Sequence, residues 1–121
     1  MKKILSMITV TFRKEGMHCY PEALTNPELA DVQFLGHPHR HLFWFDVSIQ
    51  VFENNRDIEY FQFKRWLESI YDNYTLHLNN QSCEMMCDTL AEVIGEKYPG
   101  RVVQIKISED GENSAAGVYT P

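Results

Sequence analysis

The residues from Leu42 to Phe52 are the part of the sequence that most constrains the fold. They read LFWFDVSIQVF, a run rich in aromatic and β-branched residues that contains few residues typical of turns. Such a composition is characteristic of a β-strand that is buried on at least one face. We therefore predict a long strand over Arg40–Phe52 and expect the remaining elements to be arranged around it.

Three of the five histidines directly precede this strand, at positions 37, 39 and 41. Residues two apart on an extended backbone point to the same face, so the side chains of His39 and His41 are expected side by side, about 7 Å apart along the strand. Two imidazoles so placed can bind one metal ion, although an ordinary strand opening is equally consistent with the spacing. His37 joins them only if the strand continues through Pro38, which cannot donate to a sheet. A third ligand must then come from elsewhere, and His18 and His77 are the remaining histidines.

The rest of the chain predicts a mixture of strands and helices. A strand is expected over Ser6–Phe12, followed by a turn at Arg13–Gly16, and a loop with a helical turn is expected over Pro21–Asp31. After the long strand, Glu53–Asp57 resembles a polar hairpin turn that leads to a short strand over Ile58–Phe61.

Beyond Gln62 the apolar period changes to that of a helix. Phe63, Trp66, Leu67 and Ile70 form one apolar face of a helix that ends near Tyr71–Asn73. A loop is expected over Tyr74–Gln81, and Ser82 is a suitable N-cap for a second helix that runs to about Lys97. The last strands are expected over Val102–Ile107 and Ala116–Tyr119.

These elements predict a single α+β domain spanning residues 1–121, with an antiparallel sheet and two sequential helices on one face. The length of 121 residues suits one domain. A lone chain of this size buries only about two-thirds of its unfolded surface, so association with other copies would stabilise it.

Composition narrows the classes of partner. The net charge is −6 and no basic run is present, which argues against binding to nucleic acid or to an acidic membrane surface. The apolar stretch after Met1–Leu5 is too short and too polar for a signal peptide, and no membrane span is expected. Three cysteines, an odd number, favour the reducing cytoplasm.

Several short motifs follow one another in an order that resembles a known family. They are His18, the His39-Arg40-His41 triplet, Glu59-Tyr60 with Phe63-Lys64, Gln81-Ser82-Cys83-Glu84, Ile107-Ser108-Glu109, and Tyr119. In this order they resemble the 6-pyruvoyl-tetrahydropterin synthase and 6-carboxytetrahydropterin synthase family, over nearly the whole chain. The resemblance implies the tunnelling fold (T-fold), in which a four-stranded antiparallel sheet with two helices on one face closes into a barrel across the subunits of a trimer or hexamer.

The resemblance also implies a site. His18, His39 and His41 would bind Zn²⁺, and Glu109 would anchor the pterin ring of the substrate. A carboxylate suits that role because it can accept two hydrogen bonds from an amino-amidine edge. Asp110 and Glu112 are the alternatives for this role. Without the resemblance, Glu109 is interpreted as part of an ordinary acidic turn after a strand.

Two parts of the family pattern are missing. The stretch Val32–Gly36 has no cysteine where the family carries its catalytic one, and the family's Asp-His is absent near Tyr74-Thr75. Cys19 and His77 are therefore the candidates for moving protons: a zinc ion would lower the pKa of a nearby thiol, and His77 lies close to the expected position of the Asp-His. Cys83 and Cys87 share one face of the second helix, where core packing is favoured over a metal or redox site.

Three functions follow as hypotheses. The first is a zinc-dependent carbon–oxygen lyase or pterin synthase that acts on dihydroneopterin triphosphate or a related pterin, in the 7-deazaguanine (queuosine precursor) or tetrahydropterin pathway. The second is a T-fold protein that binds zinc and a purine-like or pterin-like ligand without turnover. The third is an interaction module that needs no metal.

Overall fold

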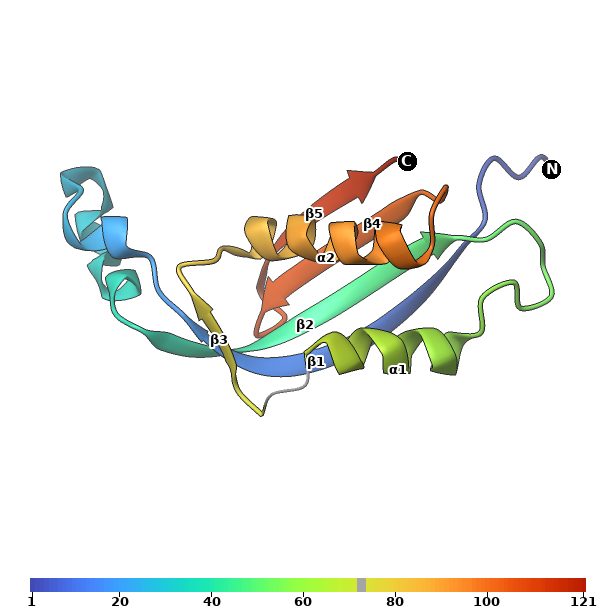
Figure 1. Cartoon of the computed structure of the whole chain (residues 1–121). Helices are drawn as coiled ribbons and strands as arrows, with labels where there is room; N and C mark the ends of the chain where they lie inside the picture. Colours follow the sequence, from blue (N-terminus) through green and yellow to red (C-terminus); the bar gives the residue numbers. More distant parts are fainter. Residues whose placement is uncertain (72–73) are drawn as a thin grey trace.

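A computed structural model describes residues 1–71 and 74–121 of the chain. In this part of the chain, a curved sheet of five strands carries two α-helices on one face (Figure 1). The elements follow one another as β1 (Met7–His18), β2 (His39–Gln50), α1 (Tyr60–Ile70), β3 (Leu76–Asn79), α2 (Cys83–Lys97), β4 (Val103–Glu109) and β5 (Asn113–Tyr119). The predicted α+β class is confirmed.

The sheet differs from the predicted antiparallel one. Its strand order is β3-β1-β2-β4-β5, and β3 pairs parallel to β1 whereas the other neighbours pair antiparallel. The sheet is therefore mixed, and the described residues give it five strands rather than four. The prediction missed β3 because this strand has only four residues and two apolar positions, Leu76 and Leu78. So short a segment forms a strand here because it pairs with β1 at the edge of the sheet.

The predicted turn at Arg13–Gly16 is wrong, because β1 continues without interruption to His18 and pairs with β2 over its whole length. Gly16 serves close packing here: a Cβ atom at this position would lie 3.0 Å from side-chain atoms of both Leu78 and Phe43. The glycine therefore marks a close approach of neighbouring side chains within the sheet.

The predicted strand at Ile58–Phe61 is also wrong. Helix α1 begins at Tyr60, and the Glu59 side chain caps it by accepting a hydrogen bond from the backbone N–H of Phe61. Glu53–Asp57 thus belongs to the connection from β2 to α1 and forms no hairpin. The predicted end of this helix, near Tyr71–Asn73, falls partly on Asp72 and Asn73, which lie outside the described residues.

The segment after β1 forms two 3₁₀-helices, η1 (Pro21–Leu24) and η2 (Pro27–Gly36), where a loop with a helical turn was expected. They extend past the end of the sheet at which β1 ends and β2 begins (Figure 1). The other predicted elements are confirmed with small shifts, including the Ser82 cap of α2, whose Oγ accepts from Met85 N–H at 3.1 Å. Strand β5 is longer than predicted and begins at Asn113.

The core lies between the two helices and one face of the sheet. Alternate residues of β2 from Phe43 to Ile49 are fully buried on this face, and α1 contributes Phe63 and Leu67 to it. Helix α1 packs on β1, and α2 packs on β4 and β5. Because side chains alternate along a strand, the same face of β2 carries His39 and His41 just before its first buried apolar residue, Phe43.

Candidate metal centre

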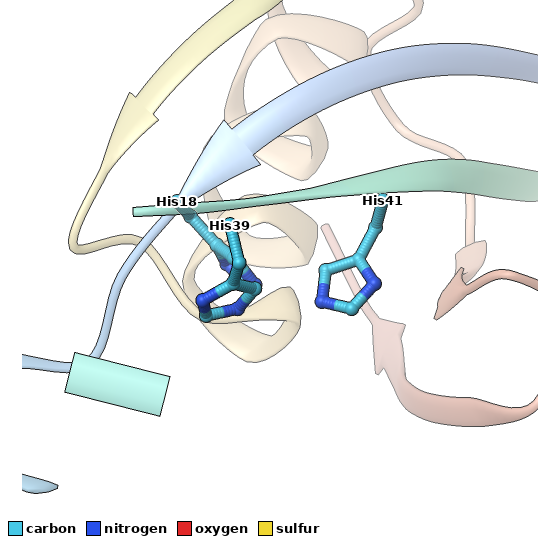
Figure 2. A group of neighbouring side chains, drawn as sticks. All are labelled: His18, His39 and His41. Atoms are coloured by element: carbon cyan, nitrogen blue, oxygen red, sulfur yellow. The ribbon is translucent and has the colours of Figure 1, made fainter. Parts of the chain in front are cut away.

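The predicted pair His39 and His41 meets a third histidine, His18, at the end of the sheet. His18 is the last residue of β1 and lies opposite His39 in the antiparallel register. One ring nitrogen of each histidine lies within 4.8 Å of the corresponding atoms of the other two, so the three side chains could bind a metal ion. Figure 2 shows the three rings on the same side of the two strands.

The rings contact one another edge to face. The centroid of the His18 ring lies 4.7 Å from that of His39 and 5.3 Å from that of His41. The His18 and His41 rings also lie 5.3 Å and 5.8 Å from the Phe43 ring. The cluster thus continues the core face directly from Phe43, the first buried aromatic residue of β2. His18 is buried, and His39 and His41 are half-buried.

Each ring is oriented by a hydrogen bond at its Nδ1 atom. The Nδ1–H of His18 donates to the Gln81 carbonyl at 2.8 Å, that of His39 to the His37 carbonyl at 2.8 Å, and that of His41 to Asp110 Oδ2 at 2.7 Å. A carbonyl or carboxylate oxygen only accepts, so in each neutral ring the proton resides on Nδ1 and the lone pair on Nε2. Metal-ligating histidines in other proteins are commonly held in the same way, by a carbonyl or carboxylate oxygen at the ring nitrogen that does not bind the metal.

Asp110 orients His41, a role that the sequence analysis did not assign to it. Its other carboxylate oxygen accepts from Leu42 N–H at 2.9 Å. Two hydrogen bonds lower the pKa of Asp110 below its ordinary value. The one from Leu42 N–H has the larger effect, and the one from His41 has the smaller. The acidic turn after β4 was the one sequence feature that could have indicated this contact with His41. Pairing between β4 and β2 brings this turn to the first residues of β2.

Glu109, the predicted anchor for the substrate, lies directly beside the cluster. It ends β4, pairs in register with Phe43, and therefore shares the helix-covered face with the histidines. Its Oε2 lies 2.9 Å from His41 Nε2 and its Oε1 lies 3.7 Å from His18 Nε2. The thiol of Cys83, at the start of α2, is 3.9 Å from Oε1.

The structure does not bring the two candidates for proton transfer into the cluster. His77 is exposed between the buried residues Leu76 and Leu78 of β3, so it points to the sheet face opposite the histidines. Cys19 follows His18 and is half-buried, and its N–H donates to the Asn79 carbonyl at 2.8 Å. The metal-binding group found among the described residues contains neither of them.

Cys83 and Cys87 belong to the core side of α2, as packing predicted. Burial, as the largest cause, raises the pKa of Cys83 to about 12 and that of Cys87 to about 11. Both thiols are therefore protonated near neutral pH, a state that does not favour metal or redox chemistry.

Sheet and cluster together define an α+β protein with a three-histidine site able to bind a metal ion. No protein-family model and no curated protein matches the chain. A solved structure, an uncharacterized protein from Wolinella succinogenes, is similar with a TM-score of 0.67 and 14% identity, over 95% of this chain and 98% of that one. At this identity the likeness shows the fold alone. None of the helices in the described residues is long and apolar enough to cross a membrane.

Proposed function

We propose that this protein is a zinc-dependent pterin synthase or lyase of the T-fold class, related to 6-pyruvoyl-tetrahydropterin and 6-carboxytetrahydropterin synthases. Its substrate would be dihydroneopterin triphosphate or a related pterin of the 7-deazaguanine or tetrahydropterin pathway. The observation that carries the proposal is the convergence of His18, His39 and His41, from two strands, beside the Glu109 carboxylate. The described sheet has two edge strands, β3 and β5, and we propose that copies of the chain pair there as a trimer or hexamer.

The donor set fits zinc. Three neutral imidazoles with their Nδ1 protons directed to oxygen acceptors present three Nε2 lone pairs, the ligands found in many catalytic zinc sites. His41 Nε2 supports a cation here because it is buried and has no hydrogen-bond partner among the described residues. Bound zinc would supply a Lewis acid that polarises oxygen atoms of the substrate side chain.

Glu109 would bind and orient the substrate. Its two oxygens can accept from the amino-amidine edge of a pterin, and it is partly accessible, with 26% of its side chain exposed. A ring anchored there would lie directly beside the histidine cluster. Cys19, next to His18 in the chain, remains the candidate that would move the proton, with His77 as the second candidate.

The position of His77 favours a second candidate function, a T-fold protein that binds zinc and a purine-like or pterin-like ligand without turnover. His77 faces away from the cluster within one chain, and no cysteine precedes the His39-Arg40-His41 triplet at the family's position. A chain that keeps the binding groups and has no proton-transfer group at the site would bind its ligand and leave it unchanged.

Metal analysis and a turnover assay test the proposal together. The purified protein should contain one zinc ion per chain, the His39→Ala/His41→Ala double variant should contain none, and His77→Ala should retain it. Incubation with dihydroneopterin triphosphate should then consume the substrate. Full zinc retention in the double variant would refute the metal site, and binding of a pterin without conversion would select the non-catalytic alternative.

A further inference from the structure

The carboxylate of Glu109 occupies an unusual position for a group that only anchors a substrate. It contacts two histidines of the cluster, at 2.9 Å from His41 Nε2 and 3.7 Å from His18 Nε2. Apart from these contacts, its one hydrogen-bonding neighbour among the described residues is the weak thiol donor of Cys83, at 3.9 Å. The histidines therefore provide the main polar surroundings of this carboxylate.

The contact between His41 and Glu109 leaves a buried nitrogen without a hydrogen bond. The Nδ1 atom of His41 bonds to Asp110 Oδ2 at 2.7 Å. Its Nε2 atom is buried and has no hydrogen-bond partner among the described residues, although Glu109 Oε2 lies 2.9 Å away. A cation bound between these two atoms would give both of them a partner.

The distances agree with a shared ion. Ligand atoms that lie about 2.0–2.1 Å from a tetrahedral zinc ion are separated from one another by about 3.3 Å. The distance from Glu109 Oε2 to His41 Nε2, 2.9 Å, and that from Oε1 to His18 Nε2, 3.7 Å, lie on either side of this value. The carboxylate thus lies within the range of a neighbouring ligand for two of the three imidazoles.

We propose that Glu109 is a fourth, displaceable ligand of the ion held by His18, His39 and His41. This inference rests on the metal site of the proposed function. In the resting protein, the carboxylate closes the coordination sphere. When a purine-like or pterin-like ring donates its amino-amidine edge to Glu109, those hydrogen bonds compete with the metal for the same oxygens. Ligand binding would thereby open the fourth position, so that one residue couples recognition of the ring to access to the metal.

Cobalt substitution tests the assignment without an activity assay. Co²⁺ replaces zinc in such sites, and its visible absorption reports the ligand set. We expect the cobalt spectrum of Glu109→Gln to differ from that of the unchanged protein, and we expect neutral imidazole, added as a probe, to bind the variant more tightly. Glu112→Gln is the matched control, because Glu112 is an exposed acid of the same turn. Its spectrum and imidazole affinity should equal those of the unchanged protein.

The outcomes separate this inference from the proposed function. If the unchanged protein binds one Co²⁺ but Glu109→Gln has the same spectrum and the same imidazole affinity, Glu109 is no ligand and the three-histidine site still stands. If the unchanged protein binds no metal, both proposals fail. Glu109→Ala repeats the comparison should the glutamine variant not fold, which circular dichroism would show.

Discussion

The hydrogen bond between Asp110 and His41 should control the affinity for metal, and Asp110→Asn is the change that tests it. Asp110 has a left-handed backbone, with φ of 57°, which asparagine also adopts readily. The substitution therefore keeps the shape and the backbone of the turn. It removes the charge and one of the two acceptor oxygens.

The loss of one acceptor affects His41 directly. Two donors, Leu42 N–H and His41 Nδ1–H, use the two oxygens of Asp110 at 2.9 Å and 2.7 Å. Asparagine has one oxygen, so if that oxygen accepts from Leu42, its NH₂ group faces His41 Nδ1. The ring then shifts its proton to Nε2, where it blocks the lone pair that would bind the metal.

Loss of a residue that hydrogen-bonds a metal-ligating histidine in this way typically weakens metal affinity by about 10- to 100-fold. That range corresponds to about 1.4–2.7 kcal/mol of binding free energy. A competition titration against a zinc chelator of known affinity measures the change. Glu112→Gln, which removes the same charge from the same turn, should stay within about twofold of the unchanged protein. Equal zinc affinities for Asp110→Asn and Glu112→Gln would refute the role assigned to Asp110.

Three further predictions concern stability and assembly. Phe63→Ala should lower the free energy of unfolding by about 3–5 kcal/mol in a urea titration because Phe63 is fully buried, whereas Phe61→Ala, 66% exposed on the same helix, should change it by less than about 0.5 kcal/mol; similar losses would contradict the described core. Light scattering at micromolar concentration should give the mass of a trimer or hexamer, and a monomer would contradict the proposed edge pairing. Arg101 lowers the pKa of Asp57 in the folded state, so this pair should contribute stability above the ordinary carboxyl pKa of 3.8 and lose it as the pH falls through the lowered value. Asp57→Asn should therefore reduce the acid dependence of the urea midpoint below pH 4, and an unchanged dependence would argue against the pair.

The sequence predicted those parts of the site that depend on local periodicity. The two-residue spacing of His39 and His41 placed both side chains on one face, and the strand-like run after them fixed where that face would be buried. The Ser82 cap and the apolar spacing of the helix that contains Phe63 are likewise local signals.

The parts that the sequence analysis missed depend on pairing between distant segments. The resemblance named His18 as the third histidine, but the predicted turn at Arg13–Gly16 missed the extension of β1 that carries His18 to His39 and His41. The role of Asp110 at His41 likewise follows only when the end of β4 meets the start of β2. No pattern within either segment contains that information.

The location of the cluster follows from the unequal lengths of the strands. Strands β1 and β2 have 12 residues each, whereas β4 has 7 and ends opposite Phe43. The core face of β2 therefore continues for two more inward positions, 41 and 39, past the end of its neighbour. Apolar side chains there would be left partly exposed to water, whereas histidines can use their Nδ1 atoms to bond Asp110 and the His37 carbonyl. Shifting the register of β2 by one residue would turn both rings to the opposite face, away from His18. The alternation that buries Phe43, Phe45 and Val47 thus also places the rings of His39 and His41 on the side of the sheet where His18 lies.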